Sequence, residues 1–142
     1  MRRPLEETVN ATVTTMKSER YELAVRLRHS PDDPLAVRLD LYVTDADPPV
    51  ATWVFGRDLL ATGLILPSGD GDVRVRPRGG DRTDVELVSG RTWCVVRMAS
   101  SDVRDFVTRT RSAEECADAE IDAALDRMLS EILPGGVKNA DP

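Results

Sequence analysis

Side chains able to support catalysis are few in this sequence. A hydrolase or transferase needs a nucleophile with a base, or paired carboxylates, held together in a pocket. The chain has one histidine, His29, which directly precedes the turn residues 30–34. We expect it to be a partly exposed residue with a hydrogen-bonding role. The sequence therefore predicts no catalytic residues.

Metal and phosphate sites are also not expected. Cys94, Cys116 and His29 lack the spacing of a zinc site. Asp70-Gly71-Asp72 is similar to the start of a calcium loop, but the positions after Asp72 read Val-Arg-Val-Arg-Pro and do not continue the pattern of such a loop. Gly69 and Gly71 stand beside an acid, without the lysine of a phosphate loop and ahead of a strand. We predict a tight turn here, with no metal and no cofactor.

Three arginines form the one concentrated basic feature. Arg74, Arg76 and Arg78 lie two residues apart, so an extended strand would project all three from one face, with Val73 and Val75 on the other. We call these three residues the arginine stripe. It is interpreted either as a solvated strand face or as a contact with a protein partner or neighbouring subunit. Nucleic acid is less favoured, because no aromatic residue for base stacking is interleaved with the arginines.

The charge of the chain opposes general binding to nucleic acid or anionic lipid. The formal net charge is −6. Ala113–Glu131 holds seven acidic residues and one basic residue, Arg127. The acidic start of the chain argues against a signal peptide, and the longest near-apolar run, Leu59–Leu66, is too short for a membrane span. We expect a cytoplasmic protein without membrane insertion.

Alternation of apolar and polar residues predicts the elements that would position these side chains. Gly63 is expected to end the short helix in a left-handed conformation. The fold class predicted is α+β, with an antiparallel, curved or barrel-like sheet, a short internal helix and C-terminal helices. Strands are predicted at 9–16, 23–28, 35–43, 50–55, 73–78, 83–88 and 92–98, and the short helix at 57–63.

Aromatic residues and the chain ends complete this prediction. Trp53 and Phe55, and similarly Trp93, are expected in the core. We expect a flexible N-terminus at 1–8, a single domain at 9–133 and a disordered tail at 134–142.

Two helices are predicted near the C-terminus. The first is capped by Ser100 or Ser101, with Val103, Phe106 and Val107 on its apolar face. The second begins either at the capping-box pattern from Ser112 or, after a loop, near Ala117. Its apolar residues fall on one stripe, which packs on the sheet or on another subunit. The stripe consists of Ile121, Leu125, Met128, Leu129 and Ile132.

Three segments together resemble the SsgA-like family of sporulating actinomycetes. The most specific is Trp53–Leu60 followed by Gly63-Leu64, which is similar to the family pattern of a strand running into an Arg-Asp-Leu-Leu helix. Gly69–Val75 with Pro77, and Asp33-Pro34 ahead of an alternating strand, add to it. A terminal apolar helix with Asp122 and Leu125 completes the order, so the resemblance covers Leu23–Leu133.

The resemblance implies a regulatory role in sporulation septum placement and septal wall remodelling, with no catalytic residues and no cofactor. It also implies intertwined trimers of β-barrel-like subunits, similar in topology to whirly-type domains. The family further implies docking to the tubulin-like division GTPase FtsZ or another septation or cell-wall protein. Arg57 and Asp58 belong to the family motif, so they are interface candidates as well as candidates for a local salt bridge or helix cap.

The leading hypothesis is thus a non-enzymatic, homotrimeric adaptor of sporulation-specific cell division, cytoplasmic and concentrated at the septum. The alternative is a single-stranded nucleic-acid-binding protein on a whirly-like scaffold, against which the net charge and the sparse aromatic residues count.

Overall fold

The computed structural model describes residues 4–44 and 46–132. The chain divides into two compact units, Met1–Thr110 and Arg111–Pro142, which are described separately. The elements are β1 (Leu5–Thr15), β2 (Arg20–Ser30), β3 (Asp33–Tyr42), β4 (Ala51–Gly56), α1 (Arg57–Gly63), β5 (Val73–Arg78), β6 (Arg82–Ser89), β7 (Thr92–Ala99) and α2 (Ser100–Ile132).

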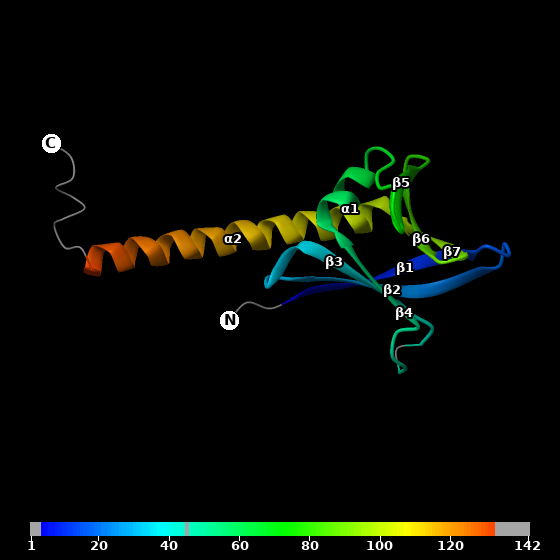
Figure 1. Cartoon of the computed structure of the whole chain (residues 1–142), viewed down its shortest axis with the longest axis horizontal. Coiled ribbons are helices and arrows are strands. Elements are labelled where there is room, and N and C mark those ends of the chain that lie inside the picture. Colours follow the sequence, from blue (N-terminus) through cyan, green and yellow to red (C-terminus); the bar gives the residue numbers. More distant parts are fainter. Residues whose placement is uncertain (1–3, 45, 133–142) are drawn as a thin grey trace. The chain divides into compact units, whose positions relative to one another are not determined.

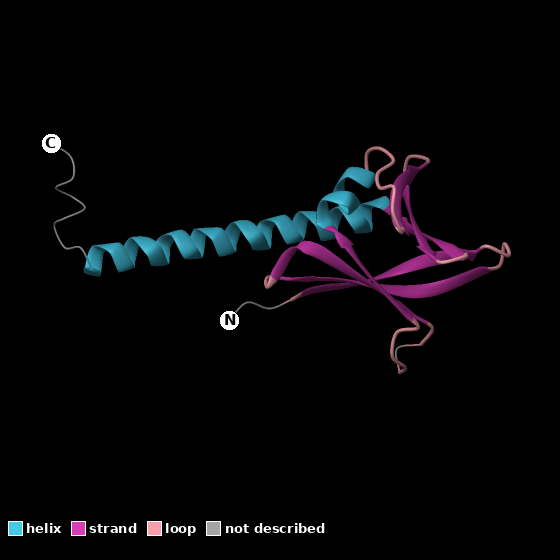
Figure 2. Ribbon diagram, in the orientation of Figure 1, coloured by secondary structure: helices cyan, strands magenta, loops and turns pink. Residues whose placement is uncertain are grey.

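The strands form one antiparallel sheet with the order β4-β3-β2-β1-β7-β6-β5. β1 joins the two halves: it pairs with β2 along most of its length, but with β7 only over Ala11–Thr15. The sheet curls into a half-barrel (Figures 1 and 2). The predicted fold class, with its seven strands, is confirmed.

Period-two alternation gives the sheet a core face and an outer face. On β2, Val25 and Leu27 are fully buried, whereas Arg26 and Arg28 lie on the outer face. α1 and the first turns of α2 pack on the core face, where Leu60 and Phe106 join the apolar cluster of the strands. Burial of this cluster is the main source of stability for the first unit.

Helix α2 differs from the prediction of two helices, because Ser100–Ile132 is continuous. No glycine or proline occurs in this range, so nothing in the backbone chemistry forces a break. The pattern at Ser112 therefore lies inside a helix, and the prediction of a start there or near Ala117 is wrong. The breaker sequence after Ile132 lies outside the described residues.

Gly63 ends α1 as predicted in position, but not in conformation. Among the described residues, the glycines with positive φ are Gly69, Gly79 and Gly90, so the predicted left-handed conformation of Gly63 is wrong. A Cβ at Gly63 would instead overlap the side chain of Val75, whose backbone carbon would lie 3.0 Å away. Gly63 is thus required by close packing of α1 against β5.

Other differences concern the ends of elements. β1 begins at Leu5, earlier than predicted, and residues 5–8 pair with β2.

Trp93 is 41% exposed, so its expected place in the core is wrong: on β7, Val96 and Met98 take the buried positions. The domain bounds stay a prediction, and the tail at 134–142 lies outside the described residues.

Candidate interaction surfaces

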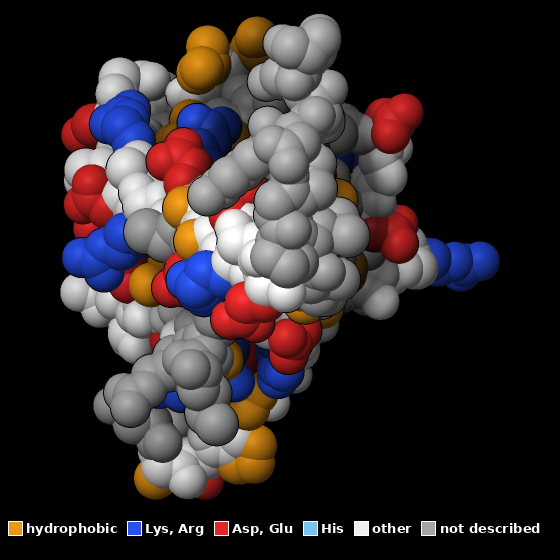
Figure 3. All heavy atoms as spheres, turned by 90° about the vertical axis from the view of Figure 1, so that its left-hand side faces the viewer, with side chains coloured by type: hydrophobic (Ala, Val, Ile, Leu, Met, Phe, Trp, Pro, Cys, Tyr) orange, Lys and Arg blue, Asp and Glu red, His pale blue; other side chains and the backbone are white. Residues whose placement is uncertain are grey.

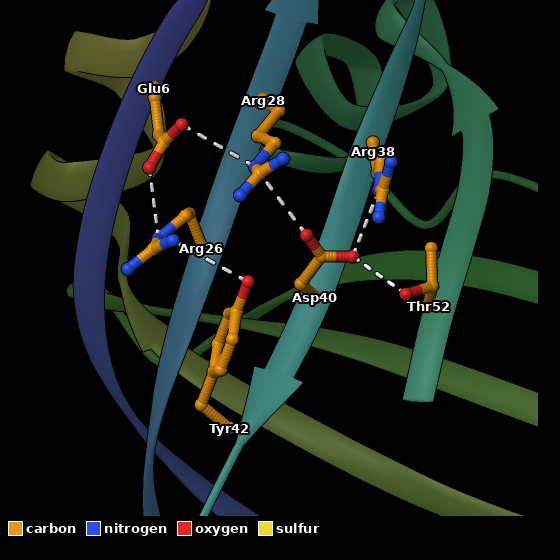
Figure 4. Close-up of polar contacts among 7 residues, drawn as sticks. All are labelled: Glu6, Arg26, Arg28, Arg38, Asp40, Tyr42 and Thr52. Carbon is orange, nitrogen blue, oxygen red and sulfur yellow. Dashed lines mark hydrogen bonds and ion pairs between the residues drawn. The ribbon is translucent and has the colours of Figure 1, made fainter. Parts of the chain in front are cut away.

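A buried carboxylate organises the outer face of β1 to β4. Asp40 is fully buried although it lies opposite the core. Thr52 Oγ1 donates a hydrogen bond of 2.7 Å to Asp40 Oδ1, and Arg38 Nε donates one of 3.0 Å to the same oxygen. Arg28 Nε lies 3.5 Å from Oδ2 (Figure 4). Three strands thus contribute side chains that cover one charge.

The same contacts set the protonation of Asp40. Burial alone would raise the pKa of its carboxyl group, because it disfavours the charged form. The hydrogen bonds from Thr52 and Arg38 and the nearby charges of Arg38 and Arg28 outweigh burial, so the pKa lies below its usual value. Asp40 therefore remains an acceptor and is unsuited to act as a general acid.

The cluster continues towards β1. Glu6 lies 3.0 Å from Arg26 Nε and 3.5 Å from Arg28 Nε. Arg26 also stacks over the ring of Tyr42, with its guanidinium carbon 4.7 Å from the ring centre. Figure 4 shows these side chains reaching across neighbouring strands. With three arginines against Glu6 and Asp40, the cluster has an excess of one positive charge.

A second buried carboxylate lies on the other half of the sheet. Asp84 on β6 accepts hydrogen bonds of 2.8 Å and 3.2 Å from Nε and Nη2 of Arg97, its cross-strand partner on β7. On its other side Asp84 is in register with Arg76 of β5. The carboxylate is thus occupied by Arg97.

The arginine stripe lies exposed on the outer face of β5, as the alternation predicts. Arg74 lies 4.0 Å from Glu86 and donates to the carbonyl of Gly71 at 3.4 Å. Among the described residues, Arg76 and Arg78 have no hydrogen bond or ion pair. Two guanidinium groups are therefore available to a partner. Their use by one stays a prediction.

The other candidate residues are placed differently. Asp58 is exposed in the first turn of α1, whereas Arg57 is only 7% exposed, so the two do not form a common surface. His29 is 3% exposed rather than partly exposed, and its Nε2 donates to the carbonyl of Pro34 at 2.9 Å. Its predicted hydrogen-bonding role is confirmed, in a buried setting.

A contact that the sequence did not reveal joins α2 to β1 within the first unit. Arg109 Nη1 lies 2.8 Å from Glu7 Oε1. Glu7 lies on the side of β1 that faces the core, where alternation predicts an apolar residue. Glu7 lies opposite Leu27 on this side of the sheet. A charged side chain that faces the core needs a partner of opposite charge, and this was the available signal that a helix would supply one.

The second unit contains the predicted apolar stripe of α2. Ile121, Leu125, Met128 and Leu129 are 45–52% exposed, and the side chain of Ile132 lies outside the described residues. The segment Ala113–Glu131 is acidic, and the apolar side chains on one face of its helix are about half exposed. A helix face of this kind is typical of a contact with another chain.

Groups that could hold a metal ion are not present among residues 4–44 and 46–132. Burial raises the pKa of the Cys94 thiol, which disfavours the nucleophilic thiolate.

No helix in the described part of the chain is long and apolar enough to cross a membrane. On the face shown in Figure 3, basic and acidic side chains are interspersed.

Comparison with known proteins gives the same family by sequence and by structure. A family model described as Streptomyces sporulation and cell division protein, SsgA, matches residues 23–115. The sporulation-specific cell division protein SsgB of Thermobifida fusca is 46% identical over 115 residues, covering 76% of this chain and 82% of that protein. The SsgB protein of Frankia casuarinae is 35% identical over 117 residues, covering 80% of each chain.

Solved structures agree. The SsgA-like sporulation-specific cell division protein from Thermobifida fusca matches with a TM-score of 0.70 and 28% identity, covering 89% of this chain and 96% of that one. A structure of SsgB from Streptomyces coelicolor matches with a TM-score of 0.68 and 26% identity, covering 78% and 88%. The family resemblance of the sequence is thereby confirmed: the chain belongs to the SsgA-like family of sporulation and cell division proteins.

Proposed function

We propose that this protein is a non-enzymatic adaptor of sporulation-specific cell division that binds other proteins in the cytoplasm at the division septum. It works as a homo-oligomer, expected to be a trimer, and presents its surfaces to a divisome or septal wall protein. The tubulin-like GTPase FtsZ is the first candidate. The names of the relatives support the process, since they are sporulation-specific cell division proteins.

The observation that supports a binding role most directly is the unpaired part of the arginine stripe. Arg76 and Arg78 are exposed on β5 and form no ion pair with an acidic residue among the described residues. Elsewhere on the outer face, Asp40 and Asp84 are covered by arginines of the same sheet. Free guanidinium groups in a chain of net charge −6 favour a local contact with a carboxylate-rich protein surface.

Binding of single-stranded nucleic acid is the competing function. The stripe lies on a strand whose intervening residues are Val75 and Pro77, so no aromatic side chain stands between the arginines for base stacking. A gel shift with single-stranded DNA at low and moderate salt tests this directly. Genuine binding would be measurable and would fall steeply with salt.

The proposal is tested with two triple variants of the full chain. The stripe variant changes Arg74, Arg76 and Arg78 to Glu. The control variant changes three exposed arginines elsewhere, Arg20, Arg91 and Arg104, to Glu, so that both carry the same change in net charge. Binding to purified FtsZ is measured by co-sedimentation with FtsZ polymers and by fluorescence anisotropy.

We expect the wild type and the control variant to bind and the stripe variant to bind at least about tenfold more weakly, with salt reducing the difference. In sporulating cells lacking the gene, wild type and control should restore septa and the stripe variant should not. Normal septation in the deletion strain would refute the proposed function. Equal FtsZ binding by all three proteins would refute the role of the stripe.

A further inference from the structure

The two edges of the sheet are built differently. At β5, Ser68 forms a bridge with Val75, with hydrogen bonds of 2.8 Å and 2.9 Å between their main chains. Pro77 removes a further main-chain donor, and the arginine stripe adds charge. Each of these features blocks the addition of another strand.

The edge at β4 lacks all three features. Ala51–Gly56 contains neither proline nor a charged side chain. Within residues 4–44 and 46–132, β4 pairs only with β3, so its other edge is unpaired. Thr52 is exposed, and Val54 is 63% exposed on the outer face. An uncharged, apolar edge of this kind is a template for a further strand.

The neighbourhood of this edge favours an acidic partner. A hollow of about 320 Å³ beside this edge has Val54 and the charged residues Arg28, Arg38 and Asp33 in its lining, so its charged lining has an excess of one positive charge. The side chains of Arg28 and Arg38 are 32% and 47% exposed, respectively. Arg38 is the cross-strand partner of Val54. An added strand would thus lie beside the apolar side chain of Val54 and beside a cluster of charged residues with an excess positive charge.

We propose that the free edge of β4 binds an extended peptide segment of another protein, in which apolar and acidic residues alternate, by strand addition. This rests on the proposed adaptor function and assigns it a second binding surface with a defined partner chemistry. A second copy of the chain is disfavoured as the occupant. Antiparallel pairing of two β4 edges would bring together two clusters of the same excess charge.

The probes are capped, fluorescent ten-residue peptides in which Val, Ile or Leu alternates with Asp or Glu. A matched set has Lys in place of the acids. A third set is N-methylated at every second residue, in both registers, which removes main-chain donors without changing the protein. Binding to the full chain is measured by anisotropy, and protection of β4 amides by hydrogen exchange.

We expect the acidic peptides to bind, to slow exchange of amides within Ala51–Gly56, and to lose affinity on N-methylation in one register. Val54→Glu should weaken binding at least about tenfold by adding a like charge at the edge. Val43→Glu is the matched control, since Val43 is also 63% exposed. It should bind within about twofold of wild type.

Binding without protection of β4, equal binding of the lysine set, or no binding by any set would overturn the proposal. A lower oligomer mass of the Val54→Glu protein, without peptide, would assign the edge to a second copy and also overturn it. The adaptor function is tested separately. Full restoration of septa by Val54→Glu refutes the peptide site alone, whereas normal septation without the gene refutes the function.

Discussion

On the outer face of the sheet, most charged side chains form ion pairs with one another. Asp40 is covered by Thr52, Arg38 and Arg28, and Asp84 by Arg97. These carboxylates stabilise the pairing of neighbouring strands by cross-strand contacts. The residues left for binding are those that form no ion pair among the described residues, above all Arg76 and Arg78, since Arg97 occupies the carboxylate of Asp84 beside Arg76.

The contribution of Asp40 to stability should depend on pH. Its pKa in the folded state is lowered below the unfolded value of about 3.9, so the stabilisation is present above that value and lost as pH falls through the folded pKa. At neutral pH we expect Asp40→Asn to cost about 1–3 kcal/mol of unfolding free energy. The difference from wild type should shrink at lower pH. Urea unfolding across the acid range measures both.

The exposed Asp70 provides the control for this experiment. Asp70→Asn should change the unfolding free energy by less than about 0.5 kcal/mol at every pH tested. A constant Asp40→Asn difference across the acid range would contradict a lowered pKa for Asp40.

Gly63 offers a test of packing at the level of one carbon atom. In an exposed helix interior, Gly→Ala stabilises by about 1 kcal/mol. At Gly63 the added methyl group overlaps Val75, so we expect Gly63→Ala to destabilise by about 1–3 kcal/mol in urea unfolding. Gly80→Ala, where a Cβ meets nothing within 4 Å, should have little effect. A stabilised Gly63→Ala protein would mean that α1 does not pack closely on β5.

Site residues were only partly predictable from sequence, for a physical reason. Alternation along one strand is local, so the exposure of Arg74, Arg76 and Arg78 could be read directly. The burial of Asp40 depends on which strands lie beside β3, and that pairing is set by contacts far apart in the chain. His29 was placed too near the surface although alternation along β2 puts it on the core face with Leu27, and its carbonyl partner, Pro34, lies close in the chain across the turn.

At the scale of elements, the strands were the easiest to predict and the C-terminal helix the hardest. Six of the strands begin or end at turns rich in Gly, Pro and Asp, which limit the position of each end. The pattern at Ser112 has the composition of a helix start, yet Ser and Glu are also tolerated inside helices. Only a true breaker would have decided the question.

The continuity of α2 can be tested with one substitution at two serines. Ser112→Pro introduces a helix-breaking residue in the interior, at a cost of about 3 kcal/mol, and should lower the helical circular dichroism signal at 222 nm. Ser101→Pro lies in the first turn, where proline is tolerated, and should retain the signal. Equal signals for both proteins would support the loop that the sequence left open near residue 112.

At the scale of the whole molecule, charge is strongly segregated along the chain. The acidic residues between Ala113 and Glu131 contrast with the arginine stripe of β5. In a homo-oligomer, the acidic helix of one copy and the stripe of another are complementary. The half-exposed Leu125 and its neighbours would add apolar contact area to that pairing.

Sedimentation of the stripe and control variants decides which partner the arginines serve. If the stripe pairs with the acidic helix of a neighbouring copy, wild type and control form a trimer of the 15.7 kDa chain and the stripe variant dissociates at the same concentration, because glutamates there would repel that helix. Moderate salt should weaken the wild-type assembly in the same direction. An unchanged mass of the stripe variant would contradict pairing with a neighbouring copy. If that variant also lost FtsZ binding, the stripe would face the separate division protein, and another surface would have to hold the oligomer together.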